Sequence, residues 1–297
     1  MMTAVVEPEE ILTDLRALDV GETVVPGYVV VEHLHRSRHF DVYDVFSEER
    51  GCRCIAKLPM PDQLGTPKVV RRLLREGELL QWLTHPHIVR VYDVISDPRP
   101  VLILEMLTGE TLAHLIDTTP RRLPLVDIAH LGLHLCAAVH YLHRHNILHL
   151  DLKPSNIVAE RQLAKVLDLS LARPPGPGKP GVGTLQYLAP EQARGDAFTF
   201  ATDVWGIGAV LFEATTGEYP FHRDFAGHEH PEIYEQTKRR IESVRTHRRV
   251  PPVFARIVDR CLESAPEQRP ALTELVDSLD DFVKQAGSKR ELVAAPR

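Results

Sequence analysis

The chain has 297 residues, of which 43% are hydrophobic and 26% are charged, and its formal net charge is −6. These values are typical of a globular protein, and the length allows one large domain or two lobes that share a cleft. The acidic balance argues against nucleic acid or an anionic membrane as the main partner. Four cysteines, of which only Cys52 and Cys54 are neighbours, favour buried or strand thiols over a metal site. We therefore expect a soluble cytoplasmic protein with reduced thiols, and no membrane span because no apolar run of about 18 residues is present.

Residues 1–26 form an acidic leader, which is compatible with disorder or with a short amphipathic helical turn. Five segments rich in β-branched residues then predict strands, at residues 28–34, 40–46, 52–58, 88–94 and 100–106. Between the third and fourth strands, apolar residues recur at helical spacing and predict a helix over residues 69–83. An N-terminal lobe of five antiparallel strands and one helix is therefore expected over residues 27–107.

The rest of the chain is predicted to be mainly helical. Helical periodicity is found at residues 111–118, 124–145, 199–216, 231–245, 252–263 and 271–284. Short apolar pieces at residues 156–160 and 164–170 predict a small hairpin, and residues 285–297 form a polar tail. The pattern predicts an α+β protein with a mainly helical lobe over residues 108–284 and a cleft where the two lobes join.

The stretch HLDLKPSN, residues 149–156, places three kinds of polar group within six residues. Asp151 can accept a proton, Lys153 can neutralise a developing negative charge, and Asn156 can offer a neutral oxygen to a hard cation. Phosphoryl transfer needs these groups, because the protein contributes mainly positioning and electrostatics to that reaction. The same residue types are also ordinary turn formers, so the stretch alone is equally compatible with a solvated turn.

Seven stretches in this order resemble the eukaryotic-type serine/threonine protein kinase family: CIAK, REGELL, HLDLKPSN, LDLS, GTLQYLAPE, DVWGIG and EQRP. The likeness covers about residues 28–283, and some stand-alone bacterial kinases have a similar overall style. It implies a bilobal kinase-like fold, in which a small β lobe binds ATP and the larger helical lobe carries catalysis and binds the protein substrate.

The resemblance also implies a role for each polar residue of the site. Asp151 would accept or orient the hydroxyl proton of the substrate, and Lys153 would neutralise the transferring phosphoryl group. Asn156 and Asp168 would hold Mg²⁺ or Mn²⁺. Lys57 would bind the ATP phosphates, since it lies late in a strand. A helix carboxylate should hold this lysine, and the family pattern favours Glu76 over the alternative Glu78.

The remaining expectations come from the same resemblance. The adenine ring would lie against the hinge residues and apolar side chains Glu105, Leu107, Leu34, Val42, Ala56 and Val158. Supporting roles are expected for His149, Thr184, Glu191, Asp203 and Arg269. Among these, Glu191 and Arg269 would form a buried ion pair, and Asp203 would brace the catalytic loop. Thr184 would shape the substrate-binding loop against the catalytic residues.

Three features depart from the family pattern. The glycine-rich phosphate loop falls on His35, Ser37 and Phe40, none of which is glycine, so we expect a looser lid and weaker ATP affinity. Leu150 replaces the arginine that pairs with an activation-segment phosphate, and residues 174–183 contain no hydroxyl side chain. We therefore expect activity that does not depend on activation-loop phosphorylation. Asp168 is followed by Leu and Ser instead of Phe and Gly, which would restrict the backbone flip of this segment.

Three functions are compatible with these residues. The first is an active serine/threonine protein kinase that transfers the ATP γ-phosphate to a protein. The second is a pseudokinase that binds nucleotide and acts as a regulatory scaffold, which the lost glycines favour. The third is a small-molecule phosphotransferase, against which the APE and DVWGIG segments argue. We expect regulatory input from a partner protein, another kinase or the leader. The sequence leaves the substrate and the oligomeric state open.

Overall fold

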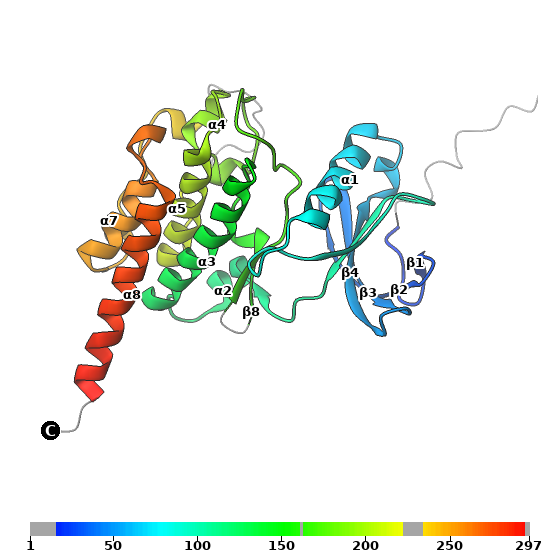
Figure 1. Ribbon diagram of the computed structural model, residues 1–297, viewed down its shortest axis with the longest axis horizontal. Helices are drawn as coiled ribbons and strands as arrows, with labels where there is room; N and C mark the ends of the chain where they lie inside the picture. The colour runs from blue at the N-terminus through cyan, green and yellow to red at the C-terminus, as the bar shows by residue number, and fades with distance from the viewer. Residues whose placement is uncertain (1–15, 161–162, 222–233, 295–297) are drawn as a thin grey trace, which may run out of the picture. The chain divides into compact units, whose positions relative to one another are not determined.

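The computed structural model describes residues 16–160, 163–221 and 234–294 (Figure 1). The chain divides into two compact units, one of Met1–Thr84 with Arg90–Met106 and one of His85–Val89 with Leu107–Arg297. The division after Met106 falls one residue before the boundary predicted at residue 107. The short segment His85–Val89, which follows the helix of the first unit, belongs to the second.

The first unit is built on an antiparallel sheet with strand order β1-β2-β3-β4-β6-β5. Its strands are β1 (Thr23–Val25), β2 (Tyr28–Arg36), β3 (Phe40–Ser47), β4 (Cys52–Pro59), β5 (Val91–Ile95) and β6 (Val101–Glu105). The five predicted strands are all present, but the sheet has six. The additional strand β1 lies in the stretch predicted as leader, and at three residues it is too short to show an alternating pattern.

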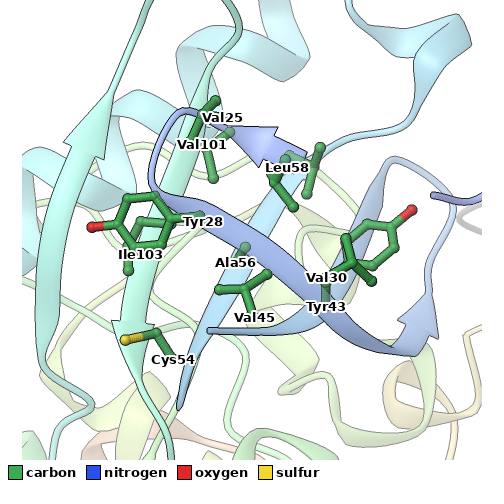
Figure 2. Close-up of a cluster of buried hydrophobic side chains, with 11 residues drawn as sticks. Val25, Tyr28, Val30, Tyr43, Val45, Cys54, Ala56, Leu58, Val101 and Ile103 are labelled. Carbon is green, nitrogen blue, oxygen red and sulfur yellow. The ribbon is translucent and has the colours of Figure 1, made fainter. Parts of the chain in front are cut away.

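A cluster of buried side chains covers one face of this sheet (Figure 2). Its members alternate along the strands, as in Cys54, Ala56 and Leu58 of β4, because successive side chains of a strand point to opposite faces. Leu18 also packs against the cluster, and its N–H donates to the Tyr43 hydroxyl at 3.0 Å. Residues 17–18 and 24–25 thus pack on the sheet, which contradicts the disorder alternative for this part of the leader, and residues 1–15 lie outside the described part.

Helix α1 (Pro67–Trp82) packs against β4, β5 and β6. The helix approaches the sheet closely at Gly77, where a Cβ atom would come within 2.5 Å of Leu102 and 2.8 Å of Val94. Glycine allows this close approach, because a Cβ atom here would force the Leu102 and Val94 side chains to move. The short 3₁₀ turn Pro61–Gln63 connects β4 to α1.

The second unit is mainly helical, as predicted. Its helices are α2 (Leu112–Thr118), α3 (Leu125–Arg144), α4 (Pro190–Arg194), α5 (Phe200–Thr216), α6 (Val244–His247), α7 (Pro252–Cys261) and α8 (Leu272–Ala294). The predicted hairpin forms β8 (Ile157–Glu160) and β9 (Leu163–Val166), and β7 (Glu110–Thr111) pairs with β8 to give a three-stranded sheet.

Helix α3 packs against α5 and α8 (Figure 1). The residues of α5 are buried along almost its whole length. Among the described helices, only α3 has the length and apolar composition that could cross a membrane. Core helices of globular proteins can have the same length and apolar composition. Helix α3 packs against two neighbouring helices, as a core helix does.

Two predicted boundaries differ from the structure. The stretch 231–245 is not one helix in its described part, which contains only the 3₁₀ turn Glu235–Thr237 and the start of α6. The boundary predicted at residue 284 lies inside α8, which continues to Ala294. The polar composition of residues 285–297 suggested a tail, but polar residues with good helix propensity also extend an existing helix.

Candidate active site

The loop that carries the candidate catalytic residues is held by Asp203, a buried residue in the first turn of α5. Its carboxylate accepts the backbone N–H groups of His149 and Leu150, both at 2.9 Å. Leu150 adopts a φ of +69°, which is unfavourable for a bulky residue. The two charge-assisted hydrogen bonds offset this strain, so the predicted bracing role of Asp203 has a direct geometric basis.

Asp151, Lys153 and Thr184 form a closed set of polar contacts. The ammonium of Lys153 lies 3.0 Å from Asp151 Oδ2 and donates to the Thr184 hydroxyl at 2.7 Å. That hydroxyl donates in turn to Asp151 Oδ1 at 2.7 Å. The arrangement fixes the carboxylate as a hydrogen-bond acceptor beside a positive charge, which is what orienting a hydroxyl nucleophile requires.

Asn156 lies in the 3₁₀ turn Pro154–Asn156, which directly precedes β8. Its amide nitrogen donates to the Asp151 carbonyl at 3.0 Å, which fixes the orientation of the carboxamide. Its backbone carbonyl accepts the N–H of Leu167 at 2.9 Å, so Asn156 and Asp168 lie on neighbouring segments. A carboxamide oxygen and a carboxylate are the hard ligands that Mg²⁺ or Mn²⁺ prefers.

No group of three or more His, Cys, Asp or Glu side chains within the described ranges could hold a metal ion by itself. The donor set of Asn156 and Asp168 therefore fits a divalent ion whose other ligands come from water or from nucleotide phosphates. Asp168 Oδ1 also accepts the N–H of Ser170 at 2.8 Å, which orients the carboxylate.

His149 is fully enclosed and has a structural part in the loop. Its Nδ1 accepts the backbone N–H of Asp151 at 3.2 Å. Burial lowers the pKa of His149, because the charged imidazolium would lose its hydration. The ring is therefore a neutral packing element beneath Asp151.

In the first unit, Lys57 and Glu76 form a buried ion pair. The lysine ammonium lies 3.0 Å and 2.7 Å from the two oxygens of Glu76, and the side chains are 11% and 0% exposed. Glu78, the alternative partner, is exposed on α1. Glu76, and not Glu78, is therefore the partner of Lys57. The ion pair holds the lysine ammonium in one position.

The turn between β2 and β3 occupies the position of the expected phosphate loop. The N–H of Ser37 donates to the Phe40 carbonyl at 2.8 Å, and the N–H of Phe40 donates to the Ser37 hydroxyl at 3.1 Å. The Phe40 ring lies 5.3 Å from the Lys57 ammonium. The backbone N–H groups of Ser37 and Phe40, where the family pattern has glycine, are therefore already used within the turn. An aromatic ring also lies over the Lys57 ammonium.

The residues predicted around the adenine ring divide between the two units. Val42 pairs directly with Lys57 across the β3–β4 ladder and shares its face of the sheet. Leu34 lies in β2 and is 45% exposed. Glu105 ends β6, where its side chain accepts the N–H of Arg90 at 2.8 Å. Leu107 and the buried Val158 of β8 belong to the second unit.

The prediction for Ala56 is wrong. Its side chain is buried in the cluster on the opposite face of β4 from Lys57 (Figure 2). Adjacent residues of a strand point to opposite faces, so Ile55, two positions before Lys57, has the orientation that was assigned to Ala56. Counting positions from Lys57 in the sequence would have identified Ile55.

Glu191 and Arg269 form the predicted ion pair in the second unit. The two guanidinium nitrogens lie 2.6 Å and 2.8 Å from the carboxylate oxygens, and the side chains are 0% and 2% exposed. The guanidinium also lies over the Trp205 ring, 5.0 Å from its centroid. A bidentate, stacked arginine of this kind satisfies a carboxylate that has no access to water.

The segment after Asp168 is attached by contacts that sequence reasoning missed. Leu150 packs with Leu148 and Phe198 in a buried apolar cluster. The side-chain amide of Gln192 donates to the carbonyls of Leu150 and Val182, each at 2.8 Å. An apolar contact and an amide bridge thus join the catalytic loop to this segment. The only sequence signal for them is the replacement of a charged residue by Leu150.

A model of the protein kinase domain matches residues 28–279 of the chain. The chain therefore belongs to the protein kinase domain family, and the predicted α+β kinase fold is confirmed. Two serine/threonine-protein kinases named PknB are similar to it. That of Mycolicibacterium smegmatis is 32% identical over 234 residues, which is 72% of this chain and 36% of the relative. That of Mycobacterium tuberculosis is 35% identical over 186 residues, which is 57% and 29%.

Myosin light chain kinase 3 of Homo sapiens is 31% identical over 216 residues, covering 69% of this chain and 26% of the relative. The chain thus spans about a third or less of the length of these curated relatives. Most of the length of each relative therefore has no counterpart in the match.

Proposed function

We propose that this chain transfers the γ-phosphoryl group of ATP to serine or threonine hydroxyls of a protein substrate. The observation that carries the proposal is the closed contact set of Asp151, Lys153 and Thr184. Asp151 accepts or orients the hydroxyl proton, and Lys153 stabilises the negative charge that develops on the phosphoryl oxygens. Thr184 keeps both side chains in one geometry, which a non-catalytic loop would have no need to maintain.

The nucleotide and the metal ion require further residues. Lys57, fixed by Glu76, supplies a positive charge for the phosphates. Asn156 and Asp168 would hold Mg²⁺ or Mn²⁺, which when bound neutralises charge on the phosphates. Ile55 and Val42 share the Lys57 face of the sheet and offer apolar contact to the base.

We also propose that activity does not depend on phosphorylation of the activation segment. Where a kinase of the phosphorylated type would place an arginine, Leu150 packs in an apolar cluster. The segment is attached instead through Gln192, whose side-chain amide donates to two backbone carbonyls and needs no charged partner. The assay is kinase activity after exhaustive phosphatase treatment and mass-spectrometric confirmation that no phosphate remains. Loss of activity in that sample contradicts this part of the proposal.

A pseudokinase that only binds nucleotide is the second candidate, and the β2–β3 turn favours it. The N–H groups of Ser37 and Phe40 are used within the turn, so fewer backbone donors are available for phosphates. Replacing His35, Ser37 and Phe40 together by Gly should increase the affinity for ATP about tenfold, measured by nucleotide titration. Equal affinity of the two proteins contradicts the account of the turn.

One assay separates the two functions. The purified chain is incubated with radiolabelled ATP, Mg²⁺ or Mn²⁺ and a generic protein substrate, beside the Asp151→Asn and Lys57→Met variants. We expect transfer by the parent and a loss of at least 100-fold in each variant, because each removes a group on which phosphoryl transfer depends. Nucleotide binding without transfer supports the pseudokinase, and transfer to a sugar or aminoglycoside alone indicates a small-molecule phosphotransferase. The cytoplasmic location and the regulatory partner stay predictions.

A further inference from the structure

The loop between α2 and α3 carries two arginines that pair with no acidic side chain among the described residues. Arg121 and Arg122 are both exposed, and neither forms an ion pair within the part of the chain that the structure describes. The guanidinium of Arg122 lies against Gly217, the residue that ends α5, where a methyl group would collide with it. Its position is thus defined by close packing even though its charge is not paired.

A third guanidinium lies beside this loop. Arg248, just after α6, donates through Nη1 to the carbonyls of Leu123 at 2.9 Å and Thr215 at 3.2 Å. It therefore ties the α2–α3 loop to the end of α5. Burial and the neighbouring charge of Arg122 lower the pKa of Arg248. The two cations disfavour each other, and a bound anion would relieve this repulsion.

Arg121 and Arg122, but not Arg248, line a cavity of about 310 Å³. Leu115 and Ile116 of α2 and Leu123 of the loop supply an apolar lining, and Arg121 and Arg122 lie at the same cavity. A volume of about 300 Å³ is enough for a small ligand group. The cavity thus combines apolar surface with positive charge, on a protein whose net charge is −6.

Capping of α5 explains only part of this cluster. Arg248 alone satisfies the Thr215 carbonyl at the negative end of the helix. Arg121 and Arg122 make no hydrogen bond to the last carbonyls of α5 among the described residues. Holding additional like charges together is unfavourable for folding, so a ligand of opposite charge accounts for them better.

We propose that this cavity docks an acidic segment of the protein substrate. Carboxylates of the segment pair with Arg121 and Arg122, and an apolar side chain beside them enters the cavity between Leu115 and Leu123. Arginine suits this role because its planar fork binds a carboxylate through two parallel hydrogen bonds. This proposal rests on the proposed kinase function in one respect: the protein that docks here is taken to be the substrate that is phosphorylated.

The position of the cavity gives the docking a consequence for catalysis. Helix α2 packs against the turn Pro154–Asn156, so the cavity and the candidate catalytic loop belong to the same unit. A substrate held at the cavity meets the loop at a raised effective concentration. Docking should therefore lower the KM for acidic substrates and leave kcat unchanged.

Direct binding provides a test that does not depend on catalysis. The probe is a fluorescein-labelled peptide of glutamates with two leucines, titrated by anisotropy against the full chain that carries Asp151→Asn. We expect binding that weakens as salt is raised, and at least a tenfold loss in the Arg121→Glu/Arg122→Glu double variant. The milder Arg121→Gln variant should lose about threefold. It keeps the test valid if the double variant fails to fold, which the melting temperature reports.

The matched control is Arg144→Glu, an exposed arginine at the opposite end of α3, about 28 Å along the helix. This variant should bind the peptide as the parent does. Equal binding by the Arg121→Gln and parent chains overturns the proposal, as does binding of anionic lipid vesicles without binding of the peptide. A lysine-for-glutamate version of the peptide should not bind.

Kinetics distinguish docking from a failure of the proposed function. In the chain with Asp151 intact, the double variant should raise the KM for dephosphorylated casein about tenfold, with the KM for histone unchanged or lower. Peptide binding without any phosphoryl transfer preserves the docking site and contradicts only the kinase activity. Equal KM values for casein in the parent and the folded double variant contradict the docking role.

Discussion

Replacing Arg269 by Ala should strongly destabilise the second unit. The guanidinium neutralises Glu191 and also donates to three backbone carbonyls, those of Glu263, Ala201 and Ser264. Its removal leaves a carboxylate that is 2% exposed without a counter-charge. Breaking a buried pair from one side costs about 3–5 kcal/mol. A domain is typically stable by only about 5–15 kcal/mol, so the variant should be close to unfolding.

The two halves of the pair should respond unequally. In Glu191→Gln the arginine keeps its three carbonyl acceptors, so we expect a loss of about 1–2 kcal/mol. In Arg269→Ala no other side chain that the structure describes bonds to the Glu191 carboxylate. The double variant should therefore recover about 1–3 kcal/mol relative to the sum of the single changes, because the stranded charge is gone.

Tryptophan fluorescence can follow this unit alone. The chain has two tryptophans, of which Trp82 belongs to the first unit and Trp205 lies under the Arg269 guanidinium. With Trp82→Phe as the background, urea unfolding monitored at Trp205 reports the second unit for the parent and each variant. A loss below 1 kcal/mol for Arg269→Ala, or equal losses for the two single variants, refutes the reasoning.

Three further changes test other parts of the site. Leu150→Arg should destabilise the second unit by at least about 3 kcal/mol, because it introduces a charge into an apolar cluster; unchanged urea unfolding contradicts this. Thr184→Val should lower kcat about 10- to 100-fold with little change in the KM for ATP, and an unchanged kcat would show that the hydroxyl bridge is dispensable. Burial raises the pKa of Glu213 from 4.5 to about 7, so the folded chain retains a proton that the unfolded chain has lost between these pH values. Stability should therefore fall as pH rises from about 4.5 to 7, by about 3 kcal/mol at most, and Glu213→Gln should flatten this part of the stability profile. An equal pH slope in the Glu213→Gln variant contradicts the assignment.

Most of the strands and helices, and a set of candidate site residues, could be predicted from the sequence alone. Alternation predicted five of the six strands, because one face of the sheet is buried and the period of a strand is two. The order of the polar motifs, through the resemblance to the kinase family, predicted Lys57, Asp151 and Asp168 as site residues without any knowledge of distances. The strand pattern is local, whereas the site residues are recognised only because several short motifs occur together in one order along the chain.

The tertiary structure decided how distant residues combine. Only folding shows that Glu76 reaches Lys57 and that Glu78 remains exposed, because the choice depends on how α1 rotates against the sheet. It also shows which face of β4 is buried in the apolar cluster, because that depends on what packs over the sheet; Ala56 lies on this buried face.

Several other contacts in the fold could not be predicted from neighbouring residues in the sequence. Gln192 bridges Leu150 and Val182, and Arg122 packs on Gly217, across long separations in sequence. Three-residue β1 joins the sheet because β2 supplies its partner, although the strand has no pattern of its own. Such contacts depend on how whole helices and strands pack together, and no short stretch of sequence reveals that packing.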